Sequence, residues 1–245
     1  MTPGFLSCRI SHITQWAPGL RSMRLDHVSS RFVAGQFFQL ALSEDGMTNK
    51  RSYSAASKPG EPLEFLMSEV PAGVLTPAIF RLREGDELDL DPTPLGYFTL
   101  DEVPDCRVLW LISTGTGLGP TLSMLRQGSI FKRFAQICVV HGVRETEQLA
   151  YANELRELGR TCGLAYLPVV SRDAPPFGGL AGRVTQAYES GALERSASLA
   201  IDADAHVLLC GNPEMIEDMT VLLKARGLKK HRRREPGHFN YEKYW

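Results

Sequence analysis

The hydrophobic pattern of the chain changes once, near residues 101–104, and this change constrains the fold more than any other feature. Before it, short apolar runs at residues 31–42, 63–70 and 87–90 alternate with turn-forming clusters rich in Ser, Asp, Gly and Pro. Closely spaced strands with little helix between them are typical of an antiparallel barrel. We therefore expect an antiparallel Greek-key β-barrel over residues 1–101.

After the change, apolar runs of strand length alternate with segments of helical length. The runs are residues 108–112, 137–140, 164–170 and 206–209, and the helical segments include residues 147–160 and 213–226. Alternating strands and helices form parallel sheets that are covered on both faces. Residues 102–245 are therefore predicted to fold as a doubly wound nucleotide-binding domain.

Composition excludes several other classes of protein. With 43% hydrophobic and 22% charged residues the chain is too apolar for disorder, and it lacks an apolar run of the about 18 residues that span a membrane. Its five cysteines form no C-x-x-C pair and its six histidines no H-E-x-x-H pattern, so we expect no protein-ligated metal. The first ten residues lack the features of a signal peptide, which together with the scattered cysteines predicts a cytoplasmic protein.

The first region contains two motifs with residue types that suit a flavin nucleotide. On the strand R-S-Y-S, alternation places Arg51 and Tyr53 on one face and the two serines on the other. These residues offer a flavin an aromatic wall, a hydroxyl near N5 and a cation for the diphosphate, although an ordinary hairpin strand explains four residues better when they are taken alone. In G-V-L-T-P, Thr76 is expected to cap a helix that starts at Pro77, where free N–H groups favour a phosphate. A capped surface helix also explains this motif.

Two glycine motifs follow apolar strands in the second region. In S-T-G-T-G-L-G-P, Gly115, Gly117 and Gly119 let a backbone approach a diphosphate, but the spacing is not G-x-G-x-x-G, and a tight strand-to-helix turn is the alternative. In C-G-N-P-E-M, Cys210 is expected at a strand end. A small, polarisable thiol there either lies beside a nicotinamide or packs in the core.

Three arginines follow predicted strand ends: Arg144, Arg172 and Arg183. Ligands of doubly wound sheets bind at the carboxyl ends of the strands, where an acidic residue reads the ribose of NAD. Arg144, with Glu145 next to it, occupies that region here, so the cations favour the 2′-phosphate of NADP. Two charge-assisted contacts of about 1.5–3 kcal/mol each correspond to a preference of roughly 10²- to 10⁴-fold. Surface arginines are common, and it is the coincidence of three that carries the hypothesis.

Taken in this order, R-S-Y-S, G-V-L-T-P, T-G-T-G-L-G-P, V-V-S-R, A-G-R and C-G-N-P-E-M, with an ending in Tyr-Trp, resemble the bacterial-type ferredoxin/flavodoxin–NADP+ reductases from about residue 35 onward. The resemblance implies an FAD-binding barrel followed by an NADP(H)-binding domain. It also implies an oxidoreductase in which NADPH gives a hydride to flavin N5 and electrons leave singly to ferredoxin or flavodoxin.

The resemblance further implies roles for individual residues. Those implied for FAD are Arg51, Ser52, Tyr53, Ser54, Leu66, Met67, Ser68, Glu69, Val74, Leu75, Thr76, Thr116, Tyr244 and Trp245. Those implied for NADP are Val143, Arg144, Ser171, Arg172, Arg183, Gly211 and Asn212. Ser54 and Cys210 are implied as the catalytic residues that flank the hydride path.

Two residues depart from the family pattern. Glu69 is an awkward neighbour for a diphosphate unless the contact is made by the backbone or Glu69 points away. The tail runs on to Trp245, which leaves open whether its ring covers the adenine or the isoalloxazine of FAD.

Residues 229–234, with the sequence K-K-H-R-R-R, form the basic cluster of the chain. A cation cluster attracts acidic redox proteins and speeds their encounter. A solvated or nucleic-acid-binding patch is the alternative, but the net charge of −1 disfavours nucleic acid. We therefore expect ferredoxin or flavodoxin as the partner, no nucleic acid, no membrane and a monomer.

Three other functions fit parts of the pattern. An oxygenase reductase would have a fused ferredoxin with clustered cysteines, and a dihydroorotate dehydrogenase electron-transfer subunit would have a C-terminal cysteine cluster. The sequence shows neither cluster, so an oxygenase partner would have to be a separate protein. A non-catalytic flavin or nucleotide sensor would need an output domain, for which the sequence has no segment.

Overall fold

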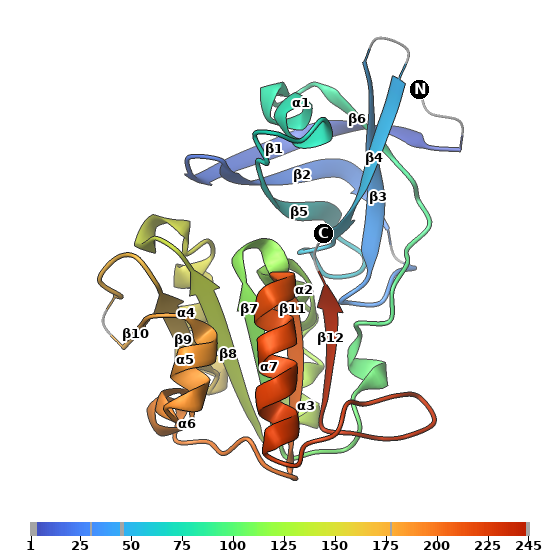
Figure 1. Cartoon of the computed structure of the whole chain (residues 1–245). Coiled ribbons are helices and arrows are strands. Elements are labelled where there is room, and N and C mark those ends of the chain that lie inside the picture. The colour runs from blue at the N-terminus through green and yellow to red at the C-terminus, as the bar shows by residue number, and fades with distance from the viewer. Residues whose placement is uncertain (1–3, 30, 45–46, 177, 244–245) are drawn as a thin grey trace. The chain divides into compact units, whose positions relative to one another are not determined.

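The computed structural model of the chain describes residues 4–29, 31–44, 47–176 and 178–243 (Figure 1). Its backbone divides into two compact units. One consists of Met1–Leu100 with Gly119–Gln127, and the other of Asp101–Leu118 with Gly128–Trp245. The chain therefore passes from one unit to the other more than once.

The first unit is built on an antiparallel six-stranded sheet. Its strands are β1 (Leu6–Ala17), β2 (Leu20–Val28), β3 (Phe37–Glu44), β4 (Met47–Ser54), β5 (Pro62–Ser68) and β6 (Glu87–Leu90), in the order β4-β3-β6-β1-β2-β5. Strand β6 joins the β1–β2 and β3–β4 hairpins, and β5 returns beside β2. A bridge between Ala55 and Phe65 connects the two outer strands, so the sheet closes on itself. The predicted antiparallel barrel is confirmed.

Aromatic side chains fill the interior of this barrel. The Phe38 ring lies between Phe32 and Phe65, with edge-to-face contacts at centroid distances of 5.5 and 6.2 Å. Such pairs add about 0.5–1.5 kcal/mol to the stabilisation from burial alone. Each of the three rings is almost fully excluded from solvent. The barrel therefore has its own hydrophobic core.

One predicted strand of the barrel begins later than expected. Residues 31–36 are not part of β3, because the Gln36 N–H donates to the Val33 carbonyl in a turn. Gly35 has a φ of +102° there, and any Cβ at this position would collide with the Phe98 backbone. The apolar residues before Phe37 therefore pack in a turn rather than in a strand.

Helix α2 (Leu118–Gln127) packs on the barrel, although it follows a strand of the other unit. The Ser123 hydroxyl donates to the Ser57 carbonyl at 2.7 Å. Arg126 donates to the Ala56 carbonyl at 2.9 Å and to the buried Glu64 carboxylate at 3.0 Å. These bonds fix the helix to the segment that follows β4.

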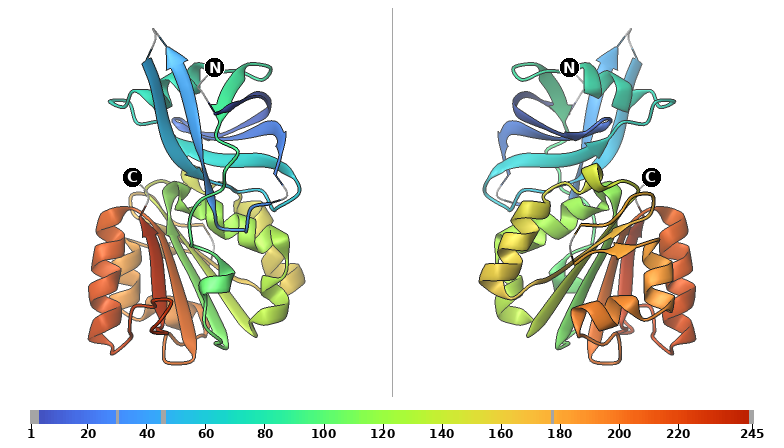
Figure 2. Two further views of the ribbon diagram at one scale, coloured as in Figure 1. Left: turned by 90° about the vertical axis from the view of Figure 1, so that its right-hand side faces the viewer. Right: turned by 90° about the vertical axis from the view of Figure 1, so that its left-hand side faces the viewer.

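The second unit is built on a parallel six-stranded sheet. Its strands are β7 (Val108–Thr114), β8 (Gln136–Val143), β9 (Ala165–Val170), β10 (Leu180–Ala181), β11 (Ala205–Gly211) and β12 (Phe239–Lys243), in the order β10-β9-β8-β7-β11-β12. Figure 2 shows α5 (Val184–Glu189), α6 (Ala192–Ala197) and α7 (Pro213–Ala225) on one face and α4 (Ala152–Cys162) on the other. The remaining elements are α1 (Leu75–Arg81), α3 (Ile130–Arg133) and the short 3₁₀ turns η1 (Leu100–Glu102), η2 (Gly115–Gly117) and η3 (Thr146–Gln148). The predicted doubly wound fold is confirmed, and the direction of strand addition reverses between β7 and β11.

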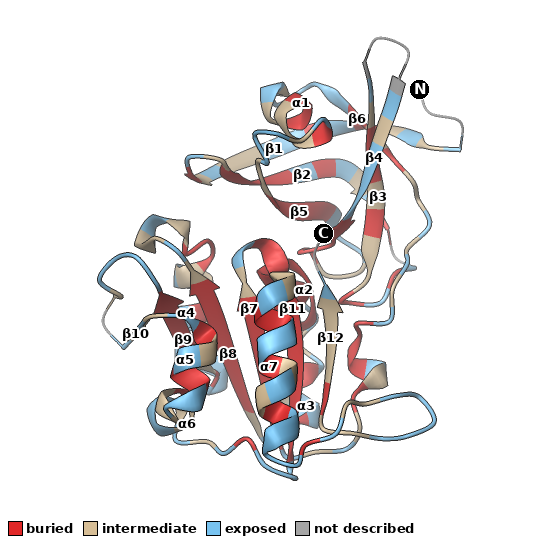
Figure 3. Ribbon diagram, in the orientation of Figure 1, coloured by how far each residue is buried: buried red, intermediate tan, exposed pale blue. Residues whose placement is uncertain are grey.

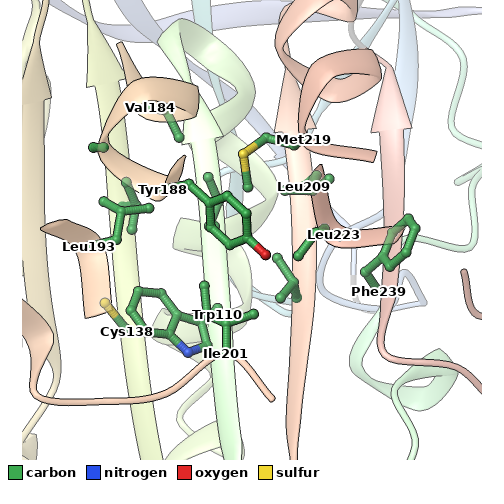
Figure 4. Close-up of a cluster of buried hydrophobic side chains, with 14 of the residues drawn as sticks. Trp110, Cys138, Val184, Tyr188, Leu193, Ile201, Leu209, Met219, Leu223 and Phe239 are labelled. Atoms are coloured by element: carbon green, nitrogen blue, oxygen red, sulfur yellow. The ribbon is translucent and has the colours of Figure 1, made fainter. Parts of the chain in front are cut away.

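The central strands of this sheet are buried along nearly their whole length, with partly exposed residues only at the ends of β7 and β8, as Figure 3 shows in red. Covered on both faces, such strands need continuous apolar runs, which is why they were recognisable in the sequence. On one face Trp110 packs with Tyr188, Met219 and Leu223 (Figure 4), and its indole N–H donates to the Ala200 carbonyl at 3.1 Å. This core is independent of the aromatic core of the barrel.

The prediction of a single helix over residues 147–160 was wrong. The segment divides into η3 and α4, because Tyr151 takes a left-handed conformation with a φ of 57°. Helix α7 begins at Pro213 as predicted, with the Asn212 side chain accepting from the N–H groups of Glu214 and Met215. Among the described helices, none combines the length and apolar character that a bilayer crossing requires.

Candidate cofactor-binding site

The R-S-Y-S motif forms the last half of β4. Its register with β3 pairs Arg51 with Leu40 and Tyr53 with Phe38, so Arg51 and Tyr53 share the face that carries the core. Burial does not follow this alternation, because Arg51 and Ser52 are exposed whereas Tyr53 and Ser54 are buried. The motif therefore presents its cation to solvent and its aromatic ring to the barrel.

Tyr53 is held by packing against Phe65, with ring centroids 6.5 Å apart. Burial raises the pKa of Tyr53 to about 12, and the nearby Arg51 charge only partly opposes this shift. The phenol is therefore protonated at neutral pH, and the ring is a neutral aromatic surface. Arg51 donates to the Lys50 carbonyl at 2.8 Å.

Strand β4 lies beside both β5 and α1, the elements that contain the other barrel residues expected to bind FAD. Beyond the bridge at Phe65, β5 pairs with β2 alone among the described strands. The outward backbone groups of residues 66–68 therefore remain available to a ligand. The side chains of Leu66 and Met67 are buried, and Met67 packs in the hydrophobic core of the barrel.

Glu69 follows β5 and contributes its charge to the barrel. Its backbone N–H donates to the Gly19 carbonyl at 2.8 Å. Burial lowers the pKa of Arg21, and the Glu69 carboxylate partly restores it. The acidic side chain therefore lies where it interacts with the buried Arg21 guanidinium.

The start of α1 differs from the prediction that Thr76 caps the helix and Pro77 opens it. The N-cap is Val74, which makes no side-chain cap, and the helix begins at Leu75. Thr76 instead binds back to Val70: its hydroxyl accepts from the Val70 N–H at 2.9 Å and lies 3.3 Å from the Val70 carbonyl. Thr76 thus shapes the loop before the helix, because both bonds join it to a residue six positions earlier in the chain.

The two glycine motifs meet at the point where the strand order reverses. The Thr114 hydroxyl at the end of β7 accepts from the Asn212 N–H after β11 at 2.9 Å. A Cβ on Gly117 would lie 2.5 Å from the Cys210 carbonyl oxygen, so only glycine permits this approach. Gly115 has a φ of +54° and open space where a Cβ would be. The carboxyl edge of β7 and β11 is therefore tightly built yet open at its glycine turn, which suits a dinucleotide backbone.

Cys210 occupies the end of β11 and is fully buried. Burial raises the pKa of Cys210 well above its usual value, and the charge of Glu242 on neighbouring β12 adds to the shift. Its sulfur is therefore a neutral thiol. Thr116, in the adjacent turn η2, is also buried.

His141, which belongs to none of the sequence motifs, supports the glycine turn. Its Nε2–H donates to the Gly115 carbonyl at 3.1 Å, while its Nδ1 is buried without a partner among the described atoms. Burial lowers the pKa of His141 to about 4, so the ring is neutral at physiological pH. The strand register that pairs Ser113 with His141 creates this contact.

The three arginines converge on the same edge of the sheet. Arg144 directly follows β8, and Arg172 and Arg183 come two residues after the ends of β9 and β10; the three strands are neighbours in the sheet. All three side chains are exposed. The Arg172 N–H donates to the Arg144 carbonyl at 2.8 Å, and the Gly182 N–H donates to the Val170 carbonyl at 2.8 Å. The fold therefore gathers cations where doubly wound sheets bind the adenosine end of a nucleotide.

The basic cluster at residues 229–234 lies at the opposite edge of this sheet. It lies in the segment before β12, four residues from the strand's start, and the amino end of β12 pairs with that of β11. Arg233 forms a two-pronged ion pair with Glu102, with nitrogen–oxygen distances of 2.7–3.1 Å, and the Lys230 ammonium lies 3.8 Å from the centre of the Tyr241 ring. Part of the positive charge is therefore engaged within the protein.

Comparison with known proteins accounts for this combination of two sheets. A family model described as the oxidoreductase NAD-binding domain matches residues 111–220. A flavodoxin/ferredoxin–NADP reductase of Shigella flexneri is 40% identical, with the alignment covering 97% of each protein. The chain belongs to the flavodoxin/ferredoxin–NADP reductase family. A ferredoxin–NADP reductase of Pseudomonas aeruginosa is 34% identical over 96% of this chain and 95% of that protein.

A solved structure of the family extends the match to three dimensions. The crystal structure of a ferredoxin NADP+ reductase from Neisseria gonorrhoeae with bound FAD and NADP superposes with a TM-score of 0.94 at 28% identity, covering 99% of both chains. Two residues of this chain that are expected to bind FAD, Tyr244 and Trp245, lie outside the residues that the structure describes. Across residues 4–243 with their gaps, no three His, Cys, Asp or Glu side chains are grouped so as to hold a metal ion.

Proposed function

We propose that the protein is an FAD-containing oxidoreductase that transfers electrons between NADPH and a one-electron carrier, ferredoxin or flavodoxin. The observation that carries the proposal is the carboxyl edge of the parallel sheet, where three exposed arginines and two interlocked glycine turns lie on one side of the same sheet. The full-length relatives named for this activity support it.

Residues 1–101, with α2 packed on them, are proposed to bind FAD, and residues 102–245 to bind NADP(H). In the barrel, the exposed Arg51 offers a cation to the diphosphate, Tyr53 offers a neutral ring, and the open backbone at the end of β5 and before α1 offers hydrogen bonds. Tyr244 and Trp245, which lie outside the described residues, are proposed to contribute to FAD binding, over either the adenine or the isoalloxazine ring. These donor types fit the group without a metal ion.

In the parallel sheet, Arg144, Arg172 and Arg183 are proposed to bind the 2′-phosphate of NADP(H), together with Val143 and Ser171. The glycine turn at Gly115–Gly117 and the segment at Gly211 and Asn212 are proposed to follow the diphosphate and the nicotinamide ribose. The Asn212 side chain caps α7, so its contribution there comes from its position rather than from a spare amide oxygen.

Ser54 and Cys210 are proposed as the catalytic residues of the hydride step. Bound FAD supplies N5 as the hydride acceptor and then releases the two electrons one at a time. The role of this chain is alignment, since hydride transfer needs reacting atoms about 3–3.5 Å apart. The Cys210 thiol is neutral, and the Gly117 backbone closely approaches the Cys210 carbonyl, so the thiol can support a nicotinamide ring without adding charge.

The natural partner is proposed to be an acidic carrier attracted by the cluster at residues 229–234. Arg232 and Arg234 are exposed there. The proposed part of the cluster is to raise the rate of encounter with the acidic carrier. All five cysteines are free thiols, which supports a reducing compartment such as the cytoplasm, and we propose a monomer.

The first experiment is purification followed by anaerobic titration. The proposal expects a yellow protein that NADPH bleaches at least 100-fold more efficiently than NADH does. Reduction of ferredoxin or flavodoxin should then follow with an efficiency that falls as salt rises. A colourless protein that takes up no added FAD would overturn the proposal.

Replacement of Cys210 tests the hydride step directly. Cys210→Ala is expected to slow flavin reduction by NADPH in rapid-mixing experiments while FAD stays bound. Cys162→Ala, which removes an exposed thiol on α4, is the matched control and should leave the rate unchanged. An unchanged rate in Cys210→Ala would refute the role of this residue.

A further inference from the structure

The loops that carry Arg144 and Arg172 are joined to each other along their backbones. Strands β8 and β9 end side by side, and the Ser171 N–H donates to the Val143 carbonyl at 3.1 Å. One residue further, the Arg172 N–H donates to the Arg144 carbonyl at 2.8 Å. The two arginines therefore project from positions that are directly bonded to one another.

A second connection lies just beyond the arginines and is made by side chains. The Asp173 carboxylate accepts from the Thr146 N–H at 3.0 Å, and the Thr146 hydroxyl donates to the Ala174 carbonyl at 2.9 Å. Arg144 and Arg172 are thus enclosed between two connections, one within the sheet and one beyond it. Without the second connection, the loops would be joined on one side only.

The same region is also fixed along the chain. The Gln148 side-chain oxygen accepts from the N–H groups of both Arg144 and Glu145 at 3.2 Å. The Glu145 carboxylate lies 4.0 Å from the Arg172 guanidinium. The bonds to backbone groups fix where the two arginine side chains leave the main chain, and the Arg172 guanidinium stays exposed beside Glu145.

We propose that Asp173 and Thr146 are positioning residues for nucleotide selectivity, which hold the Arg144 and Arg172 loops in register so that both guanidinium groups reach one 2′-phosphate. The inference rests on the proposed NADP(H)-dependent function. It gives an acidic residue a favourable role beside an anion site. The repulsion between Asp173 and a phosphate is screened because the carboxylate is exposed to solvent, whereas its hydrogen bond holds the backbone in place before the ligand arrives.

Two substitutions separate the charge of Asp173 from its hydrogen bond. Asp173→Asn keeps an oxygen that accepts from the Thr146 N–H and removes the charge, whereas Asp173→Ala removes both. Asp202→Ala is the matched control, because Asp202 also accepts a backbone N–H, that of Asp204 at 3.0 Å, in the turn before β11 at the other edge of the sheet.

The measurement is calorimetric binding of 2′,5′-ADP and of 5′-ADP to the purified holoenzyme. Loss of one positioning hydrogen bond is expected to weaken 2′,5′-ADP binding to Asp173→Ala by about three- to tenfold. Binding of 5′-ADP should change less than about twofold, and Asp173→Asn and Asp202→Ala should behave as the wild type does within about twofold. In steady-state assays with a dye acceptor, the KM for NADPH of Asp173→Ala should rise by the same factor while kcat stays constant.

Other outcomes overturn the inference in distinguishable ways. Tighter binding of 2′,5′-ADP to both Asp173 variants would show that the carboxylate only repels, and equal weakening of both nucleotides would show a general structural role. If Asp173→Ala fails to fold, Thr146→Val keeps the backbone N–H and removes only the bond to Ala174, and it must lower the 2′,5′-ADP to 5′-ADP affinity ratio. A wild-type protein with no preference for 2′,5′-ADP would overturn the proposed function itself and this inference with it.

Discussion

The two edges of the parallel sheet have the same ingredients and arrange them differently. Each edge has a group of cationic side chains and one buried histidine whose pKa is lowered to about 4 by burial, His141 at the carboxyl edge and His206 at the amino edge. At the carboxyl edge the histidine supports the glycine turn, and the cations project from fixed loops. At the amino edge His206 contacts the Gly237 carbonyl and the Asn240 amide at 3.1 and 2.8 Å, and Arg233 pairs with Glu102.

This difference teaches that the density of positive charge in a sequence does not locate an anion site. The densest cluster, residues 229–234, engages part of its charge in contacts within the protein. The three scattered arginines face solvent from loops whose backbones are fixed. A binding site needs cations that are oriented before the ligand arrives, and the second arrangement supplies that.

The largest expected effect comes from removing cations at each edge. Arg144→Ala combined with Arg172→Ala should reduce the preference for NADPH over NADH by roughly 10²- to 10⁴-fold, because two charge-assisted contacts are lost. Arg232→Ala combined with Arg234→Ala should change the KM for NADPH by less than about twofold. Steady-state kinetics with a dye acceptor check both. Comparable losses in the two double variants would erase the distinction between the edges.

The low pKa values of the two buried histidines predict that the free energy of unfolding decreases as the pH is lowered. Each has a pKa near 4 in the folded protein and about 6.5 in the unfolded chain, so only the unfolded chain takes up protons between these values. The free energy of unfolding should therefore decrease as pH falls from 6.5 to 4, by up to about 3 kcal/mol for each histidine. Denaturant titrations at a series of pH values measure this slope.

Two single variants assign the slope to the edges. His141→Gln and His206→Gln should each remove the part of the acid-induced decrease in unfolding free energy that the replaced histidine causes. If the dependence of unfolding free energy on pH is unchanged in both variants, other groups cause it, and the buried histidines of the two edges do not contribute to it.

Glycine-to-alanine substitutions at the two edges should differ by a smaller amount in the unfolding free energy that they cost. A Cβ on Gly117 would press on the Cys210 carbonyl, so Gly117→Ala is expected to cost about 1–3 kcal/mol of unfolding free energy. Gly227, after α7, has a φ of +82° and open space around a Cβ, so Gly227→Ala should cost about 1 kcal/mol from backbone strain alone. Thermal unfolding ranks the two variants. A larger loss in Gly227→Ala would contradict the view that the carboxyl edge is the more tightly built.

The smallest effect is expected for the ion pair at the amino edge. The Glu102 side chain is 18% exposed but the Arg233 side chain is 62% exposed, and solvent around the guanidinium keeps the contribution of such a pair at about 0–1 kcal/mol. Glu102→Gln should therefore lower the free energy of unfolding by no more than about 1 kcal/mol and leave the KM for NADPH unchanged. It should also leave Arg233 more available to an acidic carrier, which stopped-flow measurements of carrier reduction at low salt would detect as a faster encounter.

Much of the fold could be predicted because it depends on local patterns. Buried parallel strands require continuous apolar runs, so β7, β8, β9 and β11 were located to within a few residues. The end of one strand also predicts which residues reach the binding edge, and this rule placed the three arginines together. Strand β12 was missed, since its five residues alternate only weakly and are held by pairing with β11.

The rest of the site depends on contacts between residues far apart in the sequence. The sequence around His141 indicates only a core position, and it is the register of β7 and β8 that brings its side chain to Gly115. Thr146 and Asp173 are 27 residues apart in loops without a recognisable motif. The N-cap of α1 was misplaced for the same reason, because the Thr76 hydroxyl is bound by Val70 and is no longer available as a cap.

The attachment of α2 to the barrel restricts how the gene can be divided. The chain changes unit at residues 100–101, 118–119 and 127–128, so a single cut near residue 101 would leave this helix in the wrong fragment. Its anchoring atoms on Ser57, Ala56 and Glu64 would stay behind. Recombination that exchanges one half for that of a relative must therefore preserve this surface, and tolerated crossovers should be those in which both sides of the α2 contact come from the same parent.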